Sequence, residues 1–330
     1  MNPNLNFSAL DKKWKRSDFT SQQLSASGLD KTGGRRIIIL VVAIALGILL
    51  VLPAFVAAII GLATGRGATS WPAIVIILVI LAAVIWSLRL SGERRLRHLK
   101  FALDNNLTYS ANSLSPPPDP LMFKIGHSQR VNEQISWPNA AAALANFQYT
   151  IGYGRDSRTL HLDFMSVKLP RALPHLILNS RHNAFSPPTG DYKVQRIQLE
   201  GDFDKYFRLY APPEYQIDAL QIFTPDVMAA LIKYGEYYDF ELVGGELFVY
   251  FRSGSLNDAA RLQTILNNVA QISAQFGQQV RSYSDARAGN VASGAVAPQG
   301  LKLKRRWASV GTIVAVVIAV IYLILTAVRQ

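Results

Sequence analysis

Three long apolar runs constrain this chain more than any other feature. Residues 37–63 and 307–328 contain no ionisable residue, and residues 71–90 contain only Arg89, near the end of the run. A helix rises about 1.5 Å per residue, so some 20 residues reach across the roughly 30 Å hydrocarbon core of a bilayer. The sequence therefore predicts three transmembrane α-helices, a hairpin formed by 37–63 and 71–90 and a C-terminal span at 307–328. Buried core helices are the alternative, and a cleaved signal peptide is disfavoured because the first run and the segment before it are both too long.

Clusters of basic residues flank the three runs. The clusters are Lys12, Lys13, Lys15, Arg16, Lys31, Arg35 and Arg36 before the first run, Arg94, Arg95, Arg97 and Lys100 after the second, and Lys302, Lys304, Arg305 and Arg306 before the third. Loops rich in Lys and Arg stay on the cytoplasmic side of a membrane. The sequence thus predicts an N-terminus and a main domain in the cytoplasm and a C-terminus outside.

The distribution of charge and the absence of cysteine exclude several classes of protein. The chain of 330 residues carries a formal charge of +12, yet residues 101–300 carry a slight negative excess. Binding to a phosphate backbone needs a basic surface on the folded domain itself, so we expect no nucleic-acid partner. A chain without cysteine has no disulfide, no thiolate metal site and no cysteine nucleophile.

These patterns divide the chain into five parts. Composition shifts and Gly/Ala/Ser-rich stretches set the boundaries. The predicted parts are a disordered basic tail at 1–35, a transmembrane hairpin at 36–90, a cytosolic domain at 91–280, a flexible linker at 281–306 and a transmembrane helix at 307–328.

The cytosolic part shows the pattern of an antiparallel α+β domain with C-terminal helices. Apolar residues alternate along 147–153 and 160–164, which is typical of strands, and no helical pattern lies between them. Helical spacing predicts a helix over 93–106 and another over 256–278.

Turn and cap signals refine this prediction. Thr224-Pro225-Asp226 is typical of a helix start, and that helix is expected to run to Tyr234. Gly244-Gly245 between 238–243 and 246–251 predicts a tight hairpin. The segment 152–157 has the spacing of a glycine-rich phosphate loop, but a strand pattern follows it, so we interpret it as a hairpin turn.

Histidines and a cluster of carboxylates provide the candidate chemistry. His161 and Asp163 are two residues apart in a predicted strand and should share a face, which allows a metal-binding or acid/base role. His175 ends a segment, 169–175, whose two prolines predict a constrained edge or loop.

The densest acidic group is Glu200, Asp202 and Asp204. Alternation in an extended segment would place the three carboxylates on one side, where they could bind a divalent cation or hold a raised pKa. The alternative is a solvated turn with Lys205 and Arg208 as counter-charges. The candidates for a catalytic site are Glu200, Asp202, Asp204, His161 and His175. The sequence commits to no catalytic residue, metal or cofactor.

Several stretches resemble an uncharacterised family of bacterial membrane-anchored proteins. They are LEGDFDKYF at 199–207, LYAP at 209–212, IFTPDVMAA at 222–230, KLPR at 168–171, LPH at 173–175, ELV at 241–243 and LFVY at 247–250. The resemblance covers most of residues 120–252. It implies a bacterial cell (inner) membrane location and no activity.

Three functions are compatible with these features. The first is a membrane-anchored cytosolic scaffold or sensor domain that acts through a protein partner or an anionic lipid, which favours a protein that is not an enzyme. The second is a membrane-tethered, cation-dependent hydrolase using Glu200, Asp202 and Asp204. The third is a lipid-binding domain that holds an acyl chain between sheet and helix.

Overall fold

The computed structural model describes residues 5–30, 71–183, 195–285 and 296–301, together with 53, 56, 287 and 303. The chain divides into two compact units. Unit 1 comprises Met1–Pro118, Gly126–Lys168 and Leu247–Ala274, and unit 2 comprises Asp119–Ile125, Leu169–Glu246 and Gln275–Gln330. Strands β4 (Arg158–Ser180) and β7 (Asp239–Arg252) and helix α8 (Ala259–Val280) each contribute residues to both units.

Unit 1 is built on an antiparallel sheet with the strand order β1-β2-β3-β4. The strands β1, β2 and β3 span Thr108–Ser110, His127–Ser136 and Ala142–Ile151. The first part of β4, up to Lys168, also belongs to this unit. Buried and half-buried residues alternate along most of β2 and β3. The prediction of an antiparallel α+β fold is confirmed.

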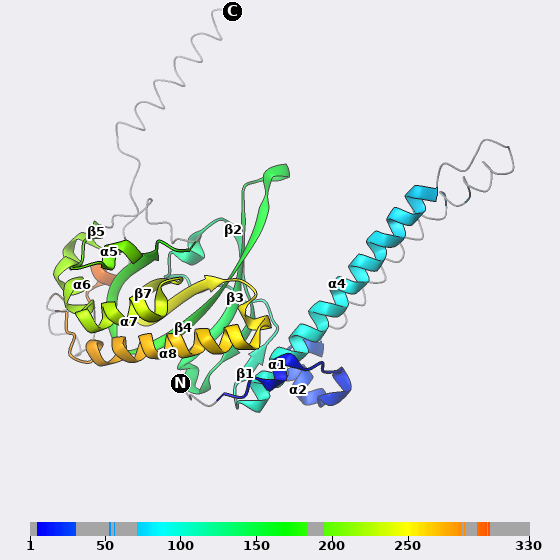
Figure 1. Ribbon diagram of the computed structural model, residues 1–330, viewed down its shortest axis with the longest axis horizontal. Coiled ribbons are helices and arrows are strands. Elements are labelled where there is room, and N and C mark those ends of the chain that lie inside the picture. Colours follow the sequence, from blue (N-terminus) through cyan, green and yellow to red (C-terminus); the bar gives the residue numbers. More distant parts are fainter. Residues whose placement is uncertain are drawn as a thin grey trace, which may run out of the picture. The chain divides into compact units, whose positions relative to one another are not determined.

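The turn between β3 and β4 has the predicted form. Ile151 pairs with Arg158, so residues 152–157 connect two antiparallel neighbours (Figure 1). Gly152 and Gly154 have φ angles of +74° and +61°, a region that glycine adopts without strain. The interpretation of this glycine-rich stretch as a hairpin turn is confirmed.

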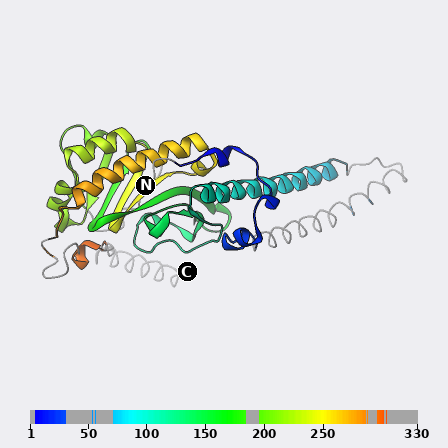
Figure 2. The same cartoon turned by 90° about the horizontal axis from the view of Figure 1, so that it is seen from below.

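Helix α4 (Trp71–Asp104) contains the helix predicted over 93–106 except for its last two residues (Figure 2). Its second half buries Leu96, Leu99 and Ala102, which recur at helical spacing. The side chain of Arg97 donates to the Leu10 carbonyl at 3.2 Å. Helix α4 is thereby linked to the N-terminal segment.

The N-terminal segment differs from the mobile tail predicted for residues 1–35. It forms α1 (Ser8–Asp11) and α2 (Ser21–Ala26), and Ala9 and Leu10 are buried. The ring of Phe7 lies 5.4 Å from that of Phe101. The N-terminal segment is polar in composition, but its few apolar side chains pack against α4.

Unit 2 has the strand order β4-β6-β5, again antiparallel. Its elements are β5 (Gln195–Ile197), α5 (Phe203–Tyr206), β6 (Phe207–Ala211), α6 (Gln216–Ile222), α7 (Pro225–Gly235) and α9 (Pro298–Leu301). Helix α7 begins with Pro225 at its first turn and follows Thr224, as the sequence predicts. The predicted helix over 256–278 is likewise present as α8.

The hairpin predicted around Gly244-Gly245 is wrong. Residues Asp239–Arg252 form one strand, β7, which pairs with β4. Gly244 has a φ angle of +58°, and a left-handed glycine inside a strand is typical of a bulge rather than a reversal. Two glycines therefore bend this strand without ending it.

Of the constrained edge or loop predicted over 169–175, the loop is wrong, because this segment lies inside β4. The ladder between β4 and β3 ends at Val167, and the ladder between β4 and β6 begins at Ile177. Pro170 and Pro174 lie between these two ladders. Proline lacks a backbone N–H group, and at these positions its absence interrupts neither ladder.

The segment predicted as a flexible linker, 281–306, is in part attached to unit 2. Tyr283 donates from its hydroxyl to Asp218 at 2.9 Å, and Tyr215 donates to Asp285 at 2.8 Å. The backbone N–H of Ala297 donates to Asp285 at 2.9 Å. Its Gly/Ala/Ser-rich composition concealed these buried polar contacts.

The prediction of three transmembrane helices is corrected. Among the helices of the described residues, none is long and apolar enough to cross a membrane. The apolar run 71–90 is the first part of α4, whose second half carries Arg94, Arg95 and Arg97. The runs 37–63 and 307–328 lie outside the described residues, apart from Pro53 and Val56. The same finding corrects three further predictions. These are the membrane as an integral partner, the multi-pass location in a bacterial cell membrane and the assignment of the main domain to the cytoplasm.

Candidate functional site

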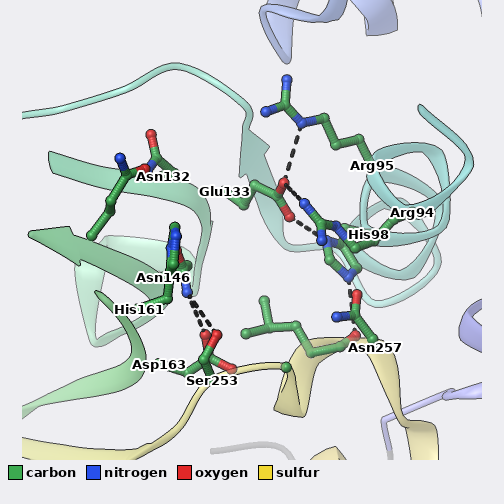
Figure 3. A pocket seen from close by; sticks show the side chains of 13 residues that line it. Arg94, Arg95, His98, Asn132, Glu133, Asn146, His161, Asp163, Ser253 and Asn257 are labelled. Carbon is green, nitrogen blue, oxygen red and sulfur yellow. Dashed lines mark hydrogen bonds and ion pairs between the residues drawn. The ribbon is translucent and has the colours of Figure 1, made fainter. Parts of the chain in front are cut away.

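A polar cavity of about 380 Å³ lies within unit 1 (Figure 3). Helix α4, strands β2, β3 and β4 and the loop after β7 supply its walls. Most of its lining side chains are charged or carry amides. The lining residues are Arg94, Arg95, His98, Asn132, Glu133, Asn146, Gln148, His161, Asp163, Ser253, Gly254, Leu256 and Asn257.

Three basic side chains of α4 converge on one carboxylate. Oε1 of Glu133 accepts from Nη2 of Arg94 at 3.0 Å and from Nε of Arg95 at 3.2 Å. Nδ1 of His98 lies 3.1 Å from Oε2 of Glu133. Residues three and four apart share a helix face, so Arg94 and Arg95 stand above His98 on α4. We call Arg94, Arg95 and His98 the cationic end of the cavity.

His98 is buried, with 2% of its surface exposed, and both of its ring nitrogens face acceptors. Nε2 lies 3.0 Å from the carbonyl oxygen of Leu256, which can only accept a hydrogen bond. The ionised carboxylate of Glu133 on the other side can also only accept. The ring of His98 is thus held between β2 and the loop after β7, with an acceptor oxygen at each nitrogen.

The backbone of Glu133 has an uncommon conformation. Its φ angle is +53°, in the left-handed region that non-glycine residues seldom adopt. Asn132 pairs with Asn146 and Ile135 with Leu144, so β2 has one more residue than β3 over this stretch. Such a bulge re-aims a side chain, and here it directs the carboxylate of Glu133 to α4. A strained residue of this kind is a frequent feature of functional sites.

The pKa of Glu133 reflects this setting. Burial disfavours the charged form and by itself raises the pKa, but the hydrogen bond and charge of His98 and the charges of Arg94 and Arg95 outweigh it. The pKa of this carboxyl therefore lies well below its usual range. Glu133 is ionised at neutral pH and offsets part of the positive charge of Arg94 and Arg95.

Asp163 and His161 lie on one face of β4, as the sequence predicts, and both line the cavity. Asn146 on β3 connects them, since its Nδ2 donates to Asp163 at 2.8 Å and its Oδ1 lies 3.4 Å from Nδ1 of His161. The other oxygen of Asp163 accepts from the backbone N–H of Ser255 at 2.9 Å. The shared face is confirmed, while a metal-binding or acid/base role for this pair stays a prediction.

Burial shifts both of these groups. It raises the pKa of Asp163 against the opposing hydrogen bonds of Asn146 and Ser255. It lowers the pKa of His161, and the positive charge of Arg94 adds to this effect. His161 is thus neutral at physiological pH and can both donate and accept a hydrogen bond.

Glu200, Asp202, Asp204 and His175 belong to unit 2 and do not line this cavity. Glu200 is exposed, Asp202 pairs with Lys205 at 2.7 Å, and Asp204 pairs with Arg196 at 3.0 Å. No group of three or more potential ligands for a metal ion occurs in the described part of the chain. The solvated-turn alternative named Lys205 and Arg208 as counter-charges; Lys205 has that role for Asp202, whereas the partner of Asp204 is Arg196.

His175 has a buried acidic partner. Its Nε2 lies 2.5 Å from Oε1 of Glu241, and both residues are almost fully buried. Glu241 also accepts from the backbone N–H groups of Leu121 and Met122. This arrangement attaches residues 121–122 to β7 within unit 2.

The sequence interpretation missed the cationic end and Glu133. It assigned the arginines at 94 and 95 to a membrane flank, although their spacing from His98 on a predicted helix indicates a shared face. The sequence carries no signal for Glu133, because its partners lie 35 to 39 positions away.

Comparison with known proteins adds little to this picture. No family model matches the chain, and no curated protein matches it. The crystal structure of the mycobacterial trehalose monomycolate transport factor A, TtfA, is similar over 55% of this chain and 93% of that chain, at 10% identity and a TM-score of 0.40. A likeness at this level supports no inference about function. The resemblance to an uncharacterised bacterial family stays a prediction.

Proposed function

We propose that the chain is a ligand-binding, sensor-type domain and that its polar cavity takes a small anionic molecule. The observation that carries the proposal is the convergence of Arg94, Arg95 and His98 on the single carboxylate of Glu133. Two guanidinium charges and the ring of His98 face one negative charge there. An anion would offset the remaining excess.

The arginines retain hydrogen-bond donors for such a ligand. Each guanidinium carries five N–H groups, and each uses one of them on Glu133. Nε of Arg94 is buried and has no hydrogen-bond partner among the described residues. A planar fork of donors suits the oxygens of a carboxylate or phosphate.

The size and lining of the cavity suit a small polar ligand. Its volume of about 380 Å³ lies at the lower end of the range for small-molecule sites. Of the residues that line it, only Gly254 and Leu256 lack a polar side chain. An acyl chain would find little apolar surface here, so the lipid-binding alternative gains no support from this cavity.

The hydrolase alternative gains no support from its own carboxylates. Glu200 and Asp202 precede α5 and Asp204 lies in its first turn, and Asp202 and Asp204 already form ion pairs. The sensor proposal still includes a protein partner that binds the ligand-bound state of the domain.

The test is calorimetric titration of the full chain with orthophosphate and with citrate. We expect millimolar or tighter binding of at least one of these anions. Arg94→Gln should weaken it about tenfold, which corresponds to the loss of roughly 1.4 kcal/mol from one charge-assisted contact. Arg89→Gln is the matched control, because Arg89 is exposed on the same helix and does not line the cavity. Absence of binding by the parent chain, or equal binding by the Arg94 and Arg89 variants, would overturn the proposal.

A further inference from the structure

The cavity has two chemically different sides. Figure 3 shows Arg94 and Arg95 on one side and Asn132 and Asn146 on the other. Gln148 follows Asn146 by two positions on β3 and therefore faces the same way. We call Asn132, Asn146 and Gln148 the amide end of the cavity.

The amide end offers donors and acceptors together. Nδ2 of Asn132 lies 3.4 Å from Oε1 of Gln148, which is a long and weak contact. A side-chain amide has two donor hydrogens and a carbonyl acceptor, so this single contact leaves most of their capacity for a ligand. Hydroxyl groups, which also donate and accept, are the matching chemistry.

The cationic end sets the charge of the ligand. Arg94 and Arg95 share the single carboxylate of Glu133, while Asp163 hydrogen-bonds with Asn146 and Ser255. The planar donor forks of the two arginines match the several oxygens of a phosphomonoester, which carries about −1.5 to −2 at neutral pH, better than they match the two oxygens of a single carboxylate.

The lining also limits what else the ligand contains. No Phe, Tyr or Trp is among the described residues that line the cavity. A nucleobase would lack the aromatic surface on which proteins usually stack it. A hydroxylated body without an aromatic ring fits better.

We propose that the ligand is a phosphorylated polyhydroxy compound, with its phosphate at the cationic end and its hydroxyl groups at the amide end. This inference rests on the proposed function and names the class of ligand for the same site. Arg94 and Arg95 bind the phosphate, while Asn132 and Gln148 bind hydroxyl groups.

The test compares ribose 5-phosphate, orthophosphate and ribose by calorimetric titration of the full chain. We expect ribose 5-phosphate to bind at least tenfold more tightly than orthophosphate, and ribose to bind most weakly. Asn132→Ala and Gln148→Ala should each weaken ribose 5-phosphate about tenfold and leave orthophosphate unchanged. Asn267→Ala, at an exposed amide of α8, should change neither and serves as the control.

The outcomes separate this inference from the function on which it rests. If orthophosphate binds in an Arg94-dependent way and ribose 5-phosphate binds no better, the polyhydroxy class is overturned and the anion site stands. If the two amide variants weaken both ligands equally, the amide end has no role in recognition and the inference fails. If neither phosphate compound binds but citrate does in an Arg94-dependent way, the phosphorylated class is overturned and the anion site stands. If citrate does not bind either, both proposals fall.

Discussion

His98 and Glu133 lie 35 positions apart in the chain, and their side chains meet with Nδ1 of His98 3.1 Å from Oε2 of Glu133. The first residue comes from the helix α4 and the second from the bulge in β2. Since Nε2 of the same imidazole faces the carbonyl of Leu256, this ion pair connects three segments of unit 1. It is the structural centre of the candidate site.

Replacing the carboxylate of this pair should destabilise the fold. Glu133→Gln leaves two arginines and the buried ring of His98 without their anion. We expect the free energy of unfolding to fall by roughly 2 to 3 kcal/mol, somewhat less than for a fully buried pair, because the side chain of Arg94 is 39% exposed. Urea denaturation measures the change. Glu93→Gln on the same helix is the control, and an equal loss in both variants would contradict a special role for Glu133.

The same carboxylate predicts a dependence of stability on acid. The folded-state pKa of Glu133 lies below the ordinary value of about 4.3. Its contribution to stability is therefore fully present above about pH 5 and is lost as the pH falls below the unfolded-state pKa. Unfolding free energies measured between about pH 6 and pH 3 should decrease less steeply in Glu133→Gln than in the parent chain. If the unfolding free energies of the two proteins change in parallel with pH, a lowered pKa of Glu133 in the folded state is contradicted.

The residues of this site show how far the sequence can predict it. Alternation along β4 places His161 and Asp163 on one face, because a strand has a period of two residues. Helical spacing can likewise bring Arg94 together with His98. The direction of Glu133 depends on an extra residue in β2, and whether a strand contains a bulge depends on its register with β3 rather than on its own residues.

The fold shows the same division between local and non-local information. The helix start at Thr224-Pro225 and the turn at residues 152–157 are local, and the structure has both. Gly244-Gly245 is equally compatible with a hairpin or a bulge, since either can use a positive φ. Here pairing of β7 with β4 favours a continuous strand. Long-range pairing also decides where Pro170 and Pro174 are tolerated.

In unit 2, the raised pKa of Asp239 predicts that stability decreases as the pH rises. Burial raises the pKa of Asp239 to about 8, against the hydrogen bonds from the Ser180 N–H and Asn183. Between the unfolded pKa of about 3.9 and this value the folded state keeps a proton that the unfolded chain loses, so stability decreases by up to about 1.4 kcal/mol per pH unit. Asp239→Asn keeps the acceptor for Ser180 and removes the ionisation. Its unfolding free energy should vary less between about pH 5 and pH 8 than that of the parent, whereas Asp156→Asn at an exposed turn should follow the parent.

The contact between Tyr215 and Asp285 predicts how firmly the segment after α8 is held. Tyr215→Phe removes a hydrogen bond to a buried carboxylate and should lower the free energy of unfolding by about 1.5 to 3 kcal/mol. The N–H of Ala297 donates to the same oxygen of Asp285, so its hydrogen exchange should become faster. Tyr237→Phe, at a ring that is 63% exposed, is the control. Unchanged exchange at Ala297 in the Tyr215 variant would mean that the segment is held by other contacts.

Two glycines in unit 1 allow backbone strain to be separated from crowding. Gly126 and Gly154 have nearly equal φ angles, +64° and +61°. A Cβ on Gly126 would lie 2.2 Å from the carbonyl oxygen of Thr150, whereas one on Gly154 would meet nothing within 4 Å. Gly154→Ala should therefore cost about 1 kcal/mol from its left-handed backbone alone.

Gly126→Ala adds a collision with the backbone of β3 to the same conformational cost. The oxygen of Thr150 cannot move without disturbing the pairing of β3 with β2 and β4, so we expect a total loss of roughly 2 to 4 kcal/mol. Chemical denaturation of the two variants side by side gives the difference directly. Equal losses would mean that the backbone at the start of β2 shifts enough to accommodate a methyl group. The pairing of His127 with Thr150 would then not be required for the sheet to form.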